Sequence, residues 1–303
     1  MWPSTGPPGE KAMEEPDPAL LDIGDCGRTS LAWEGLGSSV WARSTMLSGP
    51  AKNRSVPGSL SRVPVVDGNA TARVRELEGS TVIGKGEIHL WFAPLDLPPG
   101  ALAAMAETMD PGELARGAIY RFELHRRRYV TAHAALRRIL STYTGLAPRR
   151  IRYASEAFGR PQLAPDINPG RLDFSLSHSG GLAAVAIARG HRVGIDVEQL
   201  KGLSPEDELV ERTLSTEEWS AWRRRPPEAR TGAFLWWWTR KEACLKADGH
   251  GLRGDPRHVP VGTDSDGGPH WSLVTPYGHA RPRWAVCSLD VIPGFVASVA
   301  VVV

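Results

Sequence analysis

The chain has 303 residues, which is enough for one large domain or two modest ones with a buried core. Its formal net charge is only +2, which argues against binding nucleic acid over the whole surface. Its three cysteines lie far apart without a CxxC pair, which predicts reduced thiols rather than disulfides or a thiolate zinc site. Because no signal-like segment and no apolar run of about 18 residues is present, we expect a soluble, cytoplasmic protein without a membrane span.

The first 85 residues differ in composition from the rest of the chain. Residues 1–85 are rich in glycine, proline, serine and charge, and they show little periodic apolar pattern. Such a segment buries too little apolar surface to offset its chain entropy, so we predict a disordered or poorly ordered extension. A functional tail is the alternative, and the sequence leaves open whether the segment belongs to the mature protein.

Regular structure is expected from residue 87 onward. Alternating apolar and polar side chains over residues 87–93 predict a half-buried strand. A helical region follows over residues 110–144, with Asp110 as N-cap, Glu113 at the third helical position and an end near Gly145. A solvated helix face and a phosphate-binding face both explain the density of arginines there. These arginines are Arg116, Arg121, Arg126, Arg127, Arg128, Arg137 and Arg138.

The second part of the chain alternates strand-like and helical segments. Residues 172–177, 182–188 and 193–198 are separated by glycine-containing turns and predict an antiparallel meander. A second capping box at Ser215 and Glu218 opens a helix through Trp222. Another helix is predicted over residues 228–248, and strands over 270–274, 283–289 and 295–303. The ordered chain therefore reads as two α+β halves, residues 86–190 and 191–303.

One of these strands carries the motif Gly194-Ile195-Asp196-Val197-Glu198. Because side chains alternate along a strand, Asp196 and Glu198 share one face, and Gly194 leaves room beside them. Paired carboxylates suit Mg²⁺ or Mn²⁺, which fill their remaining positions with water and substrate phosphate. A solvent-facing sheet edge is the alternative, and it would be favoured if the motif stood alone.

A second motif, Trp238-Thr239-Arg240-Lys241-Glu242-Ala243-Cys244-Leu245-Lys246, falls on the long C-terminal helix. Trp238, Glu242 and Lys246 lie at helical spacing on one face. A surface salt bridge between Glu242 and Lys246 is the simple alternative. The apolar run at 234–238 predicts that this helix is partly buried, however, and buried charges need a partner. A metal ion with a phosphate would supply one.

Taken together, these motifs resemble those of the 4′-phosphopantetheinyl transferases of the surfactin-synthetase-activating type, over residues 87–303. Lesser matches are Phe158-Gly159-Arg160-Pro161, the segment from Phe174 to Ser179, and Gly249-His250-Gly251-Leu252. The resemblance implies a pseudo-dimer of two similar α/β halves with coenzyme A bound between them. It also implies transfer of the phosphopantetheine arm to a serine of an acyl, peptidyl or aryl carrier protein, with release of 3′,5′-ADP.

The resemblance also assigns roles to residues of the two main motifs. It implies that Asp196, Glu198 and Glu242 hold Mg²⁺, and that Glu242 or Glu198 is the base for the attacking serine. Lys246 and Lys241 correspond to lysines near the phosphates, with Lys246 the better candidate for contact.

Further residues are implied to bind coenzyme A. His178, which follows Ser177, corresponds to a residue at the 3′-phosphate. Arg128 aligns near the same phosphate, and Arg127 or Arg116 could share that role. At Gly159-Arg160-Pro161 the family more often has lysine in the middle, so Arg160 is expected to stack over adenine or to pair with phosphate.

Other functions are compatible with some of these residues. A metal-dependent phosphodiesterase or nuclease also uses acidic pairs with lysine, but the lysine expected two residues after the second acid is replaced here by Leu200. A non-catalytic anion-binding module would leave the carboxylates without a purpose. Arg223-Arg224-Arg225 is a candidate for carrier recognition, although a solvated loop also explains it. The chain lacks coiled-coil heptads, and we expect a monomer.

Overall fold

The computed structural model describes residues 32–36, 39–47, 81–84, 87–156, 159–200, 207–249, 254–263, 271–281, 283–289 and 293–303, the first two ranges by their backbone alone. Helices and sheets both build this part of the chain, which confirms the predicted α+β class. Phe158 and residues 250–252 of the lesser motifs lie outside the described residues, as does most of segment 1–85. No helix of the described ranges is long and apolar enough to cross a membrane.

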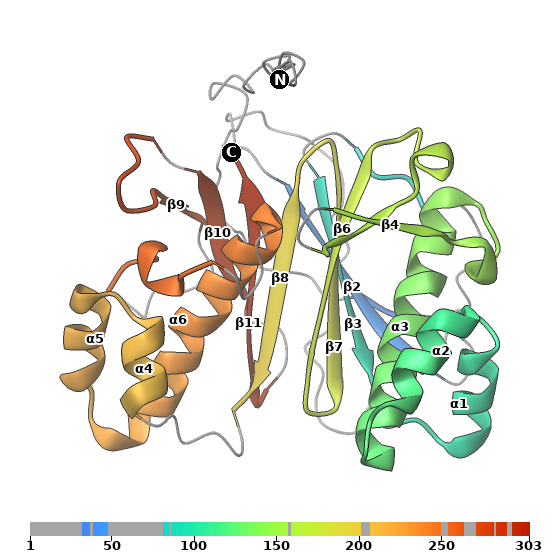
Figure 1. Cartoon of the computed structure of the whole chain (residues 1–303), viewed down its shortest axis with the longest axis horizontal. Coiled ribbons are helices and arrows are strands. Elements are labelled where there is room, and N and C mark those ends of the chain that lie inside the picture. The colour runs from blue at the N-terminus through green and yellow to red at the C-terminus, as the bar shows by residue number, and fades with distance from the viewer. Residues whose placement is uncertain are drawn as a thin grey trace, which may run out of the picture.

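Two antiparallel sheets form the centre of the molecule (Figure 1). The first has the order β1-β2-β3-β7-β6, built from β1 (Ala32–Leu36), β2 (Ser39–Leu47), β3 (Glu87–Pro94), β6 (Leu172–Ser179) and β7 (Leu182–Arg189). The second has the order β8-β11-β10-β9, built from β8 (Val193–Gln199), β9 (Trp271–Val274), β10 (Trp284–Leu289) and β11 (Phe295–Val302). A small ribbon pairs β4 (Tyr153–Ser155) with β5 (Pro161–Leu163).

Helices cover the outer face of each sheet (Figure 1). The first sheet carries α1 (Pro99–Ala106), α2 (Pro111–Ala118) and α3 (Glu123–Thr144), and the second carries α4 (Asp207–Thr213), α5 (Thr216–Arg223) and α6 (Pro227–Asp248). The described ranges also contain the short 3₁₀ turns η2 (Pro148–Arg150), η3 (Pro165–Ile167) and η5 (Pro256–His258). Both predicted capping boxes are present, and the 22-residue helices α3 and α6 end at left-handed Gly145 and Gly249.

Apolar side chains form three layers of core between these elements. One cluster fills the space between the first sheet and its helices, and another lies between the second sheet and α4–α6. The third, which includes Phe92, Ile195 and Val299, lies between the two sheets. Cys244 and Cys287 are buried, and neither forms a disulfide within the described part of the chain. The inter-sheet core holds the two halves together, and it therefore fixes the relative position of residues from each.

The structure adds to the predicted elements or differs from them in several places. The helical region 110–144 breaks between α2 and α3, so that α2 folds back and Glu113 forms a buried ion pair with Arg137 at 2.6 Å. Within the segment expected to be disordered or poorly ordered, β1 and β2 are described and extend the sheet through β3. The predicted meander is wrong at its third strand, because both edges of β7 are already paired with β3 and β6. Strand β8 therefore joins the other sheet, where it pairs with β11.

Candidate active site

Where the edge strands β6 and β8 meet, polar side chains rather than backbone pairs join the two sheets. Alternate residues of β6 face β8: Asp173, Ser175, Ser177 and Ser179. Val193 N donates to Asp173 Oδ2 at 2.7 Å, and Ile195 N donates to Ser175 Oγ at 3.1 Å. Gln199 N donates to Ser179 Oγ, also at 3.1 Å. These side chains satisfy the open edge of β8 and align its carboxylates with β6.

Ser177 belongs to a compact polar centre with Asp196 and Lys246. Its Oγ donates to Asp196 Oδ1 at 2.7 Å, and Lys246 Nζ lies 2.6 Å from that Oδ1 and 2.9 Å from Ser177 Oγ. Asp196 is 3% exposed, whereas 26% of the Lys246 side chain is exposed. The second oxygen, Asp196 Oδ2, is buried without a hydrogen-bond partner among the described residues. A buried acceptor of this kind is costly, so this centre is suited to receive a donor or a cation.

Two glutamates stand close enough to Asp196 for their charges to interact. Burial raises the pKa of Glu242 to about 7, and the negative charges of Asp196 and Glu198 add to the rise while Lys246 opposes it. Burial also raises the pKa of Glu198, against hydrogen bonds from Ser179 and Trp238. Ser179 Oγ donates to Glu198 Oε2 at 2.6 Å. The strand and helix motifs are thus brought together, as the sequence predicted.

The donor chemistry fits a divalent metal ion. Among the described residues, no three His, Cys, Asp or Glu side chains are arranged as a ready metal site, so the shared metal role of Asp196, Glu198 and Glu242 stays a prediction. The partnerless Oδ2 of Asp196 and the mutual repulsion that raises the pKa of Glu242 are what a bound cation would relieve. Carboxylate oxygens, with phosphate and water, are the ligands that Mg²⁺ prefers.

A cleft of about 890 Å³ opens beside this centre. Its walls come from both halves: Asp110, Glu113, Arg116, His133, Leu136, Tyr153, Ser155, Gly159, Arg160, Pro161, Phe174, Ser175, Leu176, His178, Lys246 and Gly249. Clefts of roughly 300–1,000 Å³ are typical of small-molecule and cofactor sites. The Tyr153 hydroxyl is buried without a partner in the described part of the chain, and it is a further group that a ligand could satisfy. Lys246 both lines the cleft and contacts Asp196, so it links the two.

Basic side chains gather at this cleft. His178 is solvent-exposed in its wall, and partial desolvation together with the charges of Lys246 and Arg128 lowers its pKa. Arg128 is close to His178 but does not line the cleft, because its guanidinium forms a two-pronged pair with Asp96 at 2.8 Å. Arg116 lines the cleft and is exposed. The structure therefore favours Arg116 over Arg128 as the arginine nearest a bound anion.

Arg160 lines the cleft, but most of its hydrogen-bonding groups are directed into the protein. Its Nη1 donates to Ala247 O at 2.9 Å, and its Nη2 donates to Asp173 Oδ2 at 2.6 Å and to Val193 O at 2.8 Å. It is 9% exposed. The prediction that Arg160 pairs with phosphate is corrected accordingly: the guanidinium ties the end of α6 to β6 and β8. Gly159, beside it, adopts a left-handed conformation with φ 84°.

Lys241 is not part of the site, contrary to the prediction that placed it near the phosphates. Its Nζ lies 2.7 Å from Glu218 Oε2 and donates to the carbonyl oxygens of Pro256 at 2.8 Å and Val259 at 2.7 Å. All three donors of the ammonium are thereby used. Lys241 and Lys246 are five residues apart on α6, which separates them by about 140° around the helix. Only one of them can face the cleft.

We expect Lys241→Met to lower the free energy of unfolding by roughly 3–5 kcal/mol, because Glu218 would be left as a buried, unpaired carboxylate. Turnover per folded molecule should be unchanged. Urea unfolding checks the first expectation, and the double variant Lys241→Met with Glu218→Gln should recover much of the loss. A Lys241→Met protein as stable as the wild type would show that the buried ion pair does not account for Lys241, and Lys241 would again be a candidate for phosphate binding.

His133, on α3, is a cleft residue that the sequence analysis missed. Burial lowers its pKa to about 4, and three neighbours add to this effect: His178, Arg116 and Arg137. Glu113 Oε1 lies 3.9 Å from His133 Nδ1 and would favour the charged ring. The Glu113 carboxylate, however, is already bound by Arg137 at 2.6 Å. Burial and the positive charges of the neighbours therefore outweigh its effect, and the pKa of His133 is lowered. His133 is therefore a neutral donor or acceptor in the cleft at pH 7.

Because the pKa of His133 falls from an unfolded value near 6.5 to about 4, the unfolded chain binds the proton first. Stability is therefore retained above about pH 6.5 and lost as the pH falls toward 4, by up to about 3 kcal/mol from this group. Urea unfolding of the wild type and His133→Gln at matched pH values isolates the contribution. Parallel pH profiles of the two proteins would contradict it.

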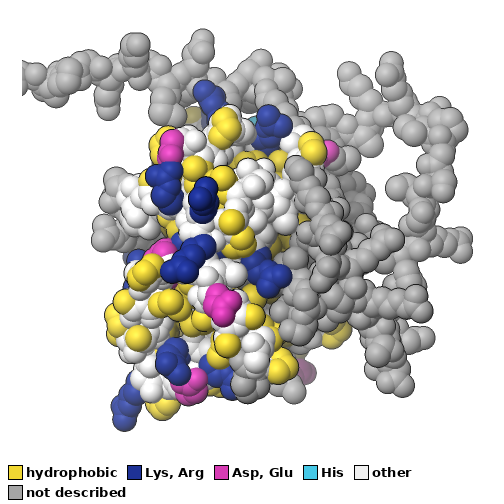
Figure 2. Space-filling model, turned by 90° about the vertical axis from the view of Figure 1, so that its right-hand side faces the viewer, with side chains coloured by type: hydrophobic (Ala, Val, Ile, Leu, Met, Phe, Trp, Pro, Cys, Tyr) yellow, Lys and Arg dark blue, Asp and Glu magenta, His cyan; other side chains and the backbone are white. Residues whose placement is uncertain are grey.

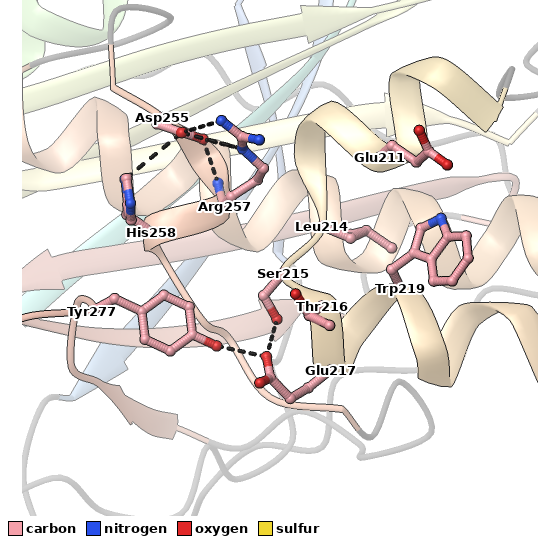
Figure 3. Close-up of a pocket in the computed structure, with 10 residues that line it drawn as sticks. All are labelled: Glu211, Leu214, Ser215, Thr216, Glu217, Trp219, Asp255, Arg257, His258 and Tyr277. Atoms are coloured by element: carbon pink, nitrogen blue, oxygen red, sulfur yellow. Dashed lines mark hydrogen bonds and ion pairs between the residues drawn. The ribbon is translucent and has the colours of Figure 1, made fainter.

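A second hollow, of about 600 Å³, lies on the outer side of the C-terminal half (Figure 3). It is lined by Glu211, Leu214, Ser215, Thr216, Glu217, Trp219, Asp255, Arg257, His258 and Tyr277. Several of its polar groups pair with one another: Tyr277 donates to Glu217 at 2.7 Å, and Asp255 pairs with Arg257 at 2.7 Å. Trp219 Nε1 is buried without a hydrogen-bond partner among the described residues. Since none of the predicted site residues lines it, the inter-half cleft is the better candidate.

Residues missed by the sequence analysis fall into two groups. The polar residues of β6 repeat with a period of two, Asp173-x-Ser175-x-Ser177-x-Ser179, and this pattern was a readable sign of a polar strand face. His133 and Tyr153 gave no local sign, because they reach the cleft only through the packing of α3 and the β4–β5 ribbon.

Comparison with known proteins finds similar sequences of one kind. Residues 192–299 match the family model of the 4′-phosphopantetheinyl transferase superfamily. The chain is 38% identical over 166 residues to the 4′-phosphopantetheinyl transferase HetI of Nostoc sp., covering 55% of this chain and 70% of that protein. It is 30% identical over 117 residues to the 4′-phosphopantetheinyl transferase Sfp of Bacillus subtilis (39% and 50%). It is 28% identical over 153 residues to the L-aminoadipate-semialdehyde dehydrogenase-phosphopantetheinyl transferase of Schizosaccharomyces pombe (47% and 59%).

Proposed function

The chain belongs to the 4′-phosphopantetheinyl transferase superfamily, and on that premise we propose that it transfers the 4′-phosphopantetheine arm of coenzyme A to a serine of an apo carrier protein. The carrier is an acyl, peptidyl or aryl carrier protein, and the second product is 3′,5′-ADP. We expect the enzyme to act as a monomer and to require Mg²⁺ or Mn²⁺.

One observation carries the proposal: Lys246 joins the acidic centre to the cleft. Its ammonium lies 2.6 Å from Asp196 and also lines a cleft large enough for a nucleotide cofactor. A phosphate in the cleft would have both Lys246 and His178 in the walls around it. Opposite charge in a partly desolvated site strengthens such contacts. A pyrophosphate would thus be held next to the carboxylates.

Each residue of the site has its own role in the proposed reaction. Lys246 would donate to a phosphate oxygen and lower the charge that develops on the departing 3′,5′-ADP. Glu242, with a pKa near 7, is suited to take the proton from the attacking serine, and Glu198 is the alternative base. Bound to Asp196, Glu198 and Glu242, Mg²⁺ would supply further charge neutralisation at the pyrophosphate.

The direct test measures the mass of the carrier. The protein is incubated with coenzyme A, Mg²⁺ and a panel of apo acyl, peptidyl and aryl carrier domains, and each carrier is weighed by mass spectrometry. We expect one carrier at least to gain a phosphopantetheine arm. A panel left unmodified while DNA or RNA is cut would replace the transferase by a phosphodiesterase.

A further inference from the structure

The C-terminal end of α6 accepts hydrogen bonds from two arginines that come from different halves of the protein. Ala247 O accepts from Arg160 Nη1 at 2.9 Å and from Arg192 Nε at 3.0 Å. Arg160 directly precedes β5 in the first half (residues 86–190), and Arg192 directly precedes β8 in the second half (residues 191–303). The last carbonyl groups of a helix lack partners within the helix, and this end favours positive charge. Both guanidinium groups are therefore well placed here, and each has donors left for other partners.

A further donor of Arg192 reaches across to the first half. Its Nη2 donates to Glu156 Oε2 at 2.6 Å, and the other carboxylate oxygen of Glu156 accepts from Gln162. Both partners belong to the β4–β5 ribbon, since Glu156 directly follows β4 and Gln162 lies in β5. The ion pair is partly buried, with 40% of the Arg192 side chain and 25% of the Glu156 side chain exposed. A chain of hydrogen bonds thus runs from the ribbon through Arg192 to Ala247 O in α6.

Exposed cations are common in this protein. Figure 2 shows Lys and Arg side chains spread over one side of the molecule, so an exposed arginine is not by itself a sign of function. Arg152, for example, lies beside β4 and pairs with Asp166, with 60% and 61% of the two side chains exposed. Both residues of that pair lie in the first half. Arg192 differs from Arg152 because its partners, Glu156 and Ala247, lie in different halves.

Gly249 shows how closely the ribbon approaches the end of α6. A Cβ at Gly249 would lie 2.6 Å from Arg192 Nη2 and 2.8 Å from Glu156 Oε2. Gly249 also lines the cleft, as do Ser155, next to Glu156 in the ribbon, and Lys246, on the last turn of α6. The ion pair therefore joins the ribbon wall of the cleft to the α6 wall.

Of the two walls that the ion pair joins, the ribbon is the less firmly held. Its strands pair with each other over only three residues. Helix α6, by contrast, is buried along most of its length and packs against β8 and β11. If the ion pair were removed, the ribbon would therefore move, while α6 would stay in place with Glu242 and Lys246. Arg160 would still tie the ribbon to Ala247 O, so this movement would be partial.

We propose that Arg192 and Glu156 are positioning residues for coenzyme A: their ion pair fixes the ribbon wall of the cleft relative to the α6 wall, so that both contact the bound nucleotide. The inference rests on the proposed function, and it adds two residues that the sequence motifs did not include. Neither is among the described residues that line the cleft, so they act through those of the ribbon that do: Ser155, Gly159 and Pro161. A wall that is already in its binding position lowers the ordering cost of binding.

The test measures coenzyme A binding by calorimetry and carrier modification by steady-state kinetics. Arg192→Gln and Glu156→Gln should each raise the Kd and the KM for coenzyme A about three- to fivefold, the size expected of a partly exposed ion pair. The kcat at saturating coenzyme A and the KM for the carrier should be unchanged. The double variant should resemble either single variant, because both substitutions remove the same interaction. Arg192→Lys should recover part of the affinity, since it keeps the charge but not the planar fork. Arg152→Gln is the control and should behave like the wild type.

The outcomes separate the positioning role from the reaction. If the wild type binds coenzyme A and modifies a carrier while the variants at 156 and 192 match Arg152→Gln, the positioning role is overturned and the transferase stands. Variants that lower kcat together with the urea midpoint, at an unchanged Kd for coenzyme A, would make the ion pair a purely structural contact and would also overturn it. If the wild type neither binds coenzyme A nor modifies any carrier, the proposed function and the positioning role both fall.

Discussion

Replacing Glu242 by glutamine should lower the rate of carrier modification by about 10²–10⁴-fold, because amide nitrogen and oxygen cannot take a proton from the attacking serine. By contrast, the same substitution should raise the free energy of unfolding. The pKa of Glu242 is raised from 4.5 to about 7, so its ionised form destabilises the folded protein as the pH rises through this interval. Without added metal, Glu242→Gln should therefore be more stable than the wild type by up to about 3 kcal/mol near pH 8, and equal to it below about pH 4.5.

The measurements are single-turnover carrier modification and urea unfolding at several pH values. Glu228→Gln is a matched control on the same helix, since Glu228 is exposed in the first turn of α6. It should leave both rate and stability near those of the wild type. If Glu242→Gln lowered both the rate of carrier modification and the free energy of unfolding, Glu242 would have a structural role. Glu198 would then become the candidate base.

Local sequence signals predicted much of the fold correctly. Capping boxes are read from residues three apart, so Asp110 with Glu113 and Ser215 with Glu218 placed two helix starts. Glycine directly after a predicted helical segment placed two helix ends. Helix α1 was missed because its sequence, PGALAAMA, is small and apolar on every side and has no period to detect. The partner of β8 was missed because strand pairing depends on which edges other strands have already taken.

The candidate site was predictable wherever helix or strand geometry alone decides which face a side chain takes. Asp196 and Glu198 share a strand face, and Glu242 and Lys246 share a helix face. The predictions for Lys241 and Arg160 were wrong. Each is a cation in a motif, but each finds buried acceptors of its own that are distant in sequence, such as Glu218 for Lys241. Burial of a charge is decided by the tertiary partners available to it, which a motif does not encode.

Gly194→Ala should destabilise the protein by about 3 kcal/mol or more, because overpacking against backbone leaves no flexible group that can yield. A Cβ at Gly194 would lie 2.0 Å from Ala243 O and 2.5 Å from Ala247 N. Both atoms belong to the backbone of α6, so the helix itself would have to shift. The sequence analysis expected Gly194 to leave open room beside Asp196 and Glu198, but the backbone of α6 fills that room. The glycine lets α6 approach β8 closely enough for Lys246 to reach Asp196.

Displacement of α6 should also impair the site in whatever fraction of Gly194→Ala still folds, so activity per folded molecule should fall along with the urea midpoint. Gly232→Ala is the control on the same helix. There a Cβ would meet only the end of the Leu200 side chain at 3.9 Å, an ordinary contact. Removing a helix-interior glycine should then raise stability by about 0.5–1 kcal/mol. If Gly194→Ala proved as stable and active as Gly232→Ala, α6 could not lie against β8, and the contact between Lys246 and Asp196 on which the site depends would be lost.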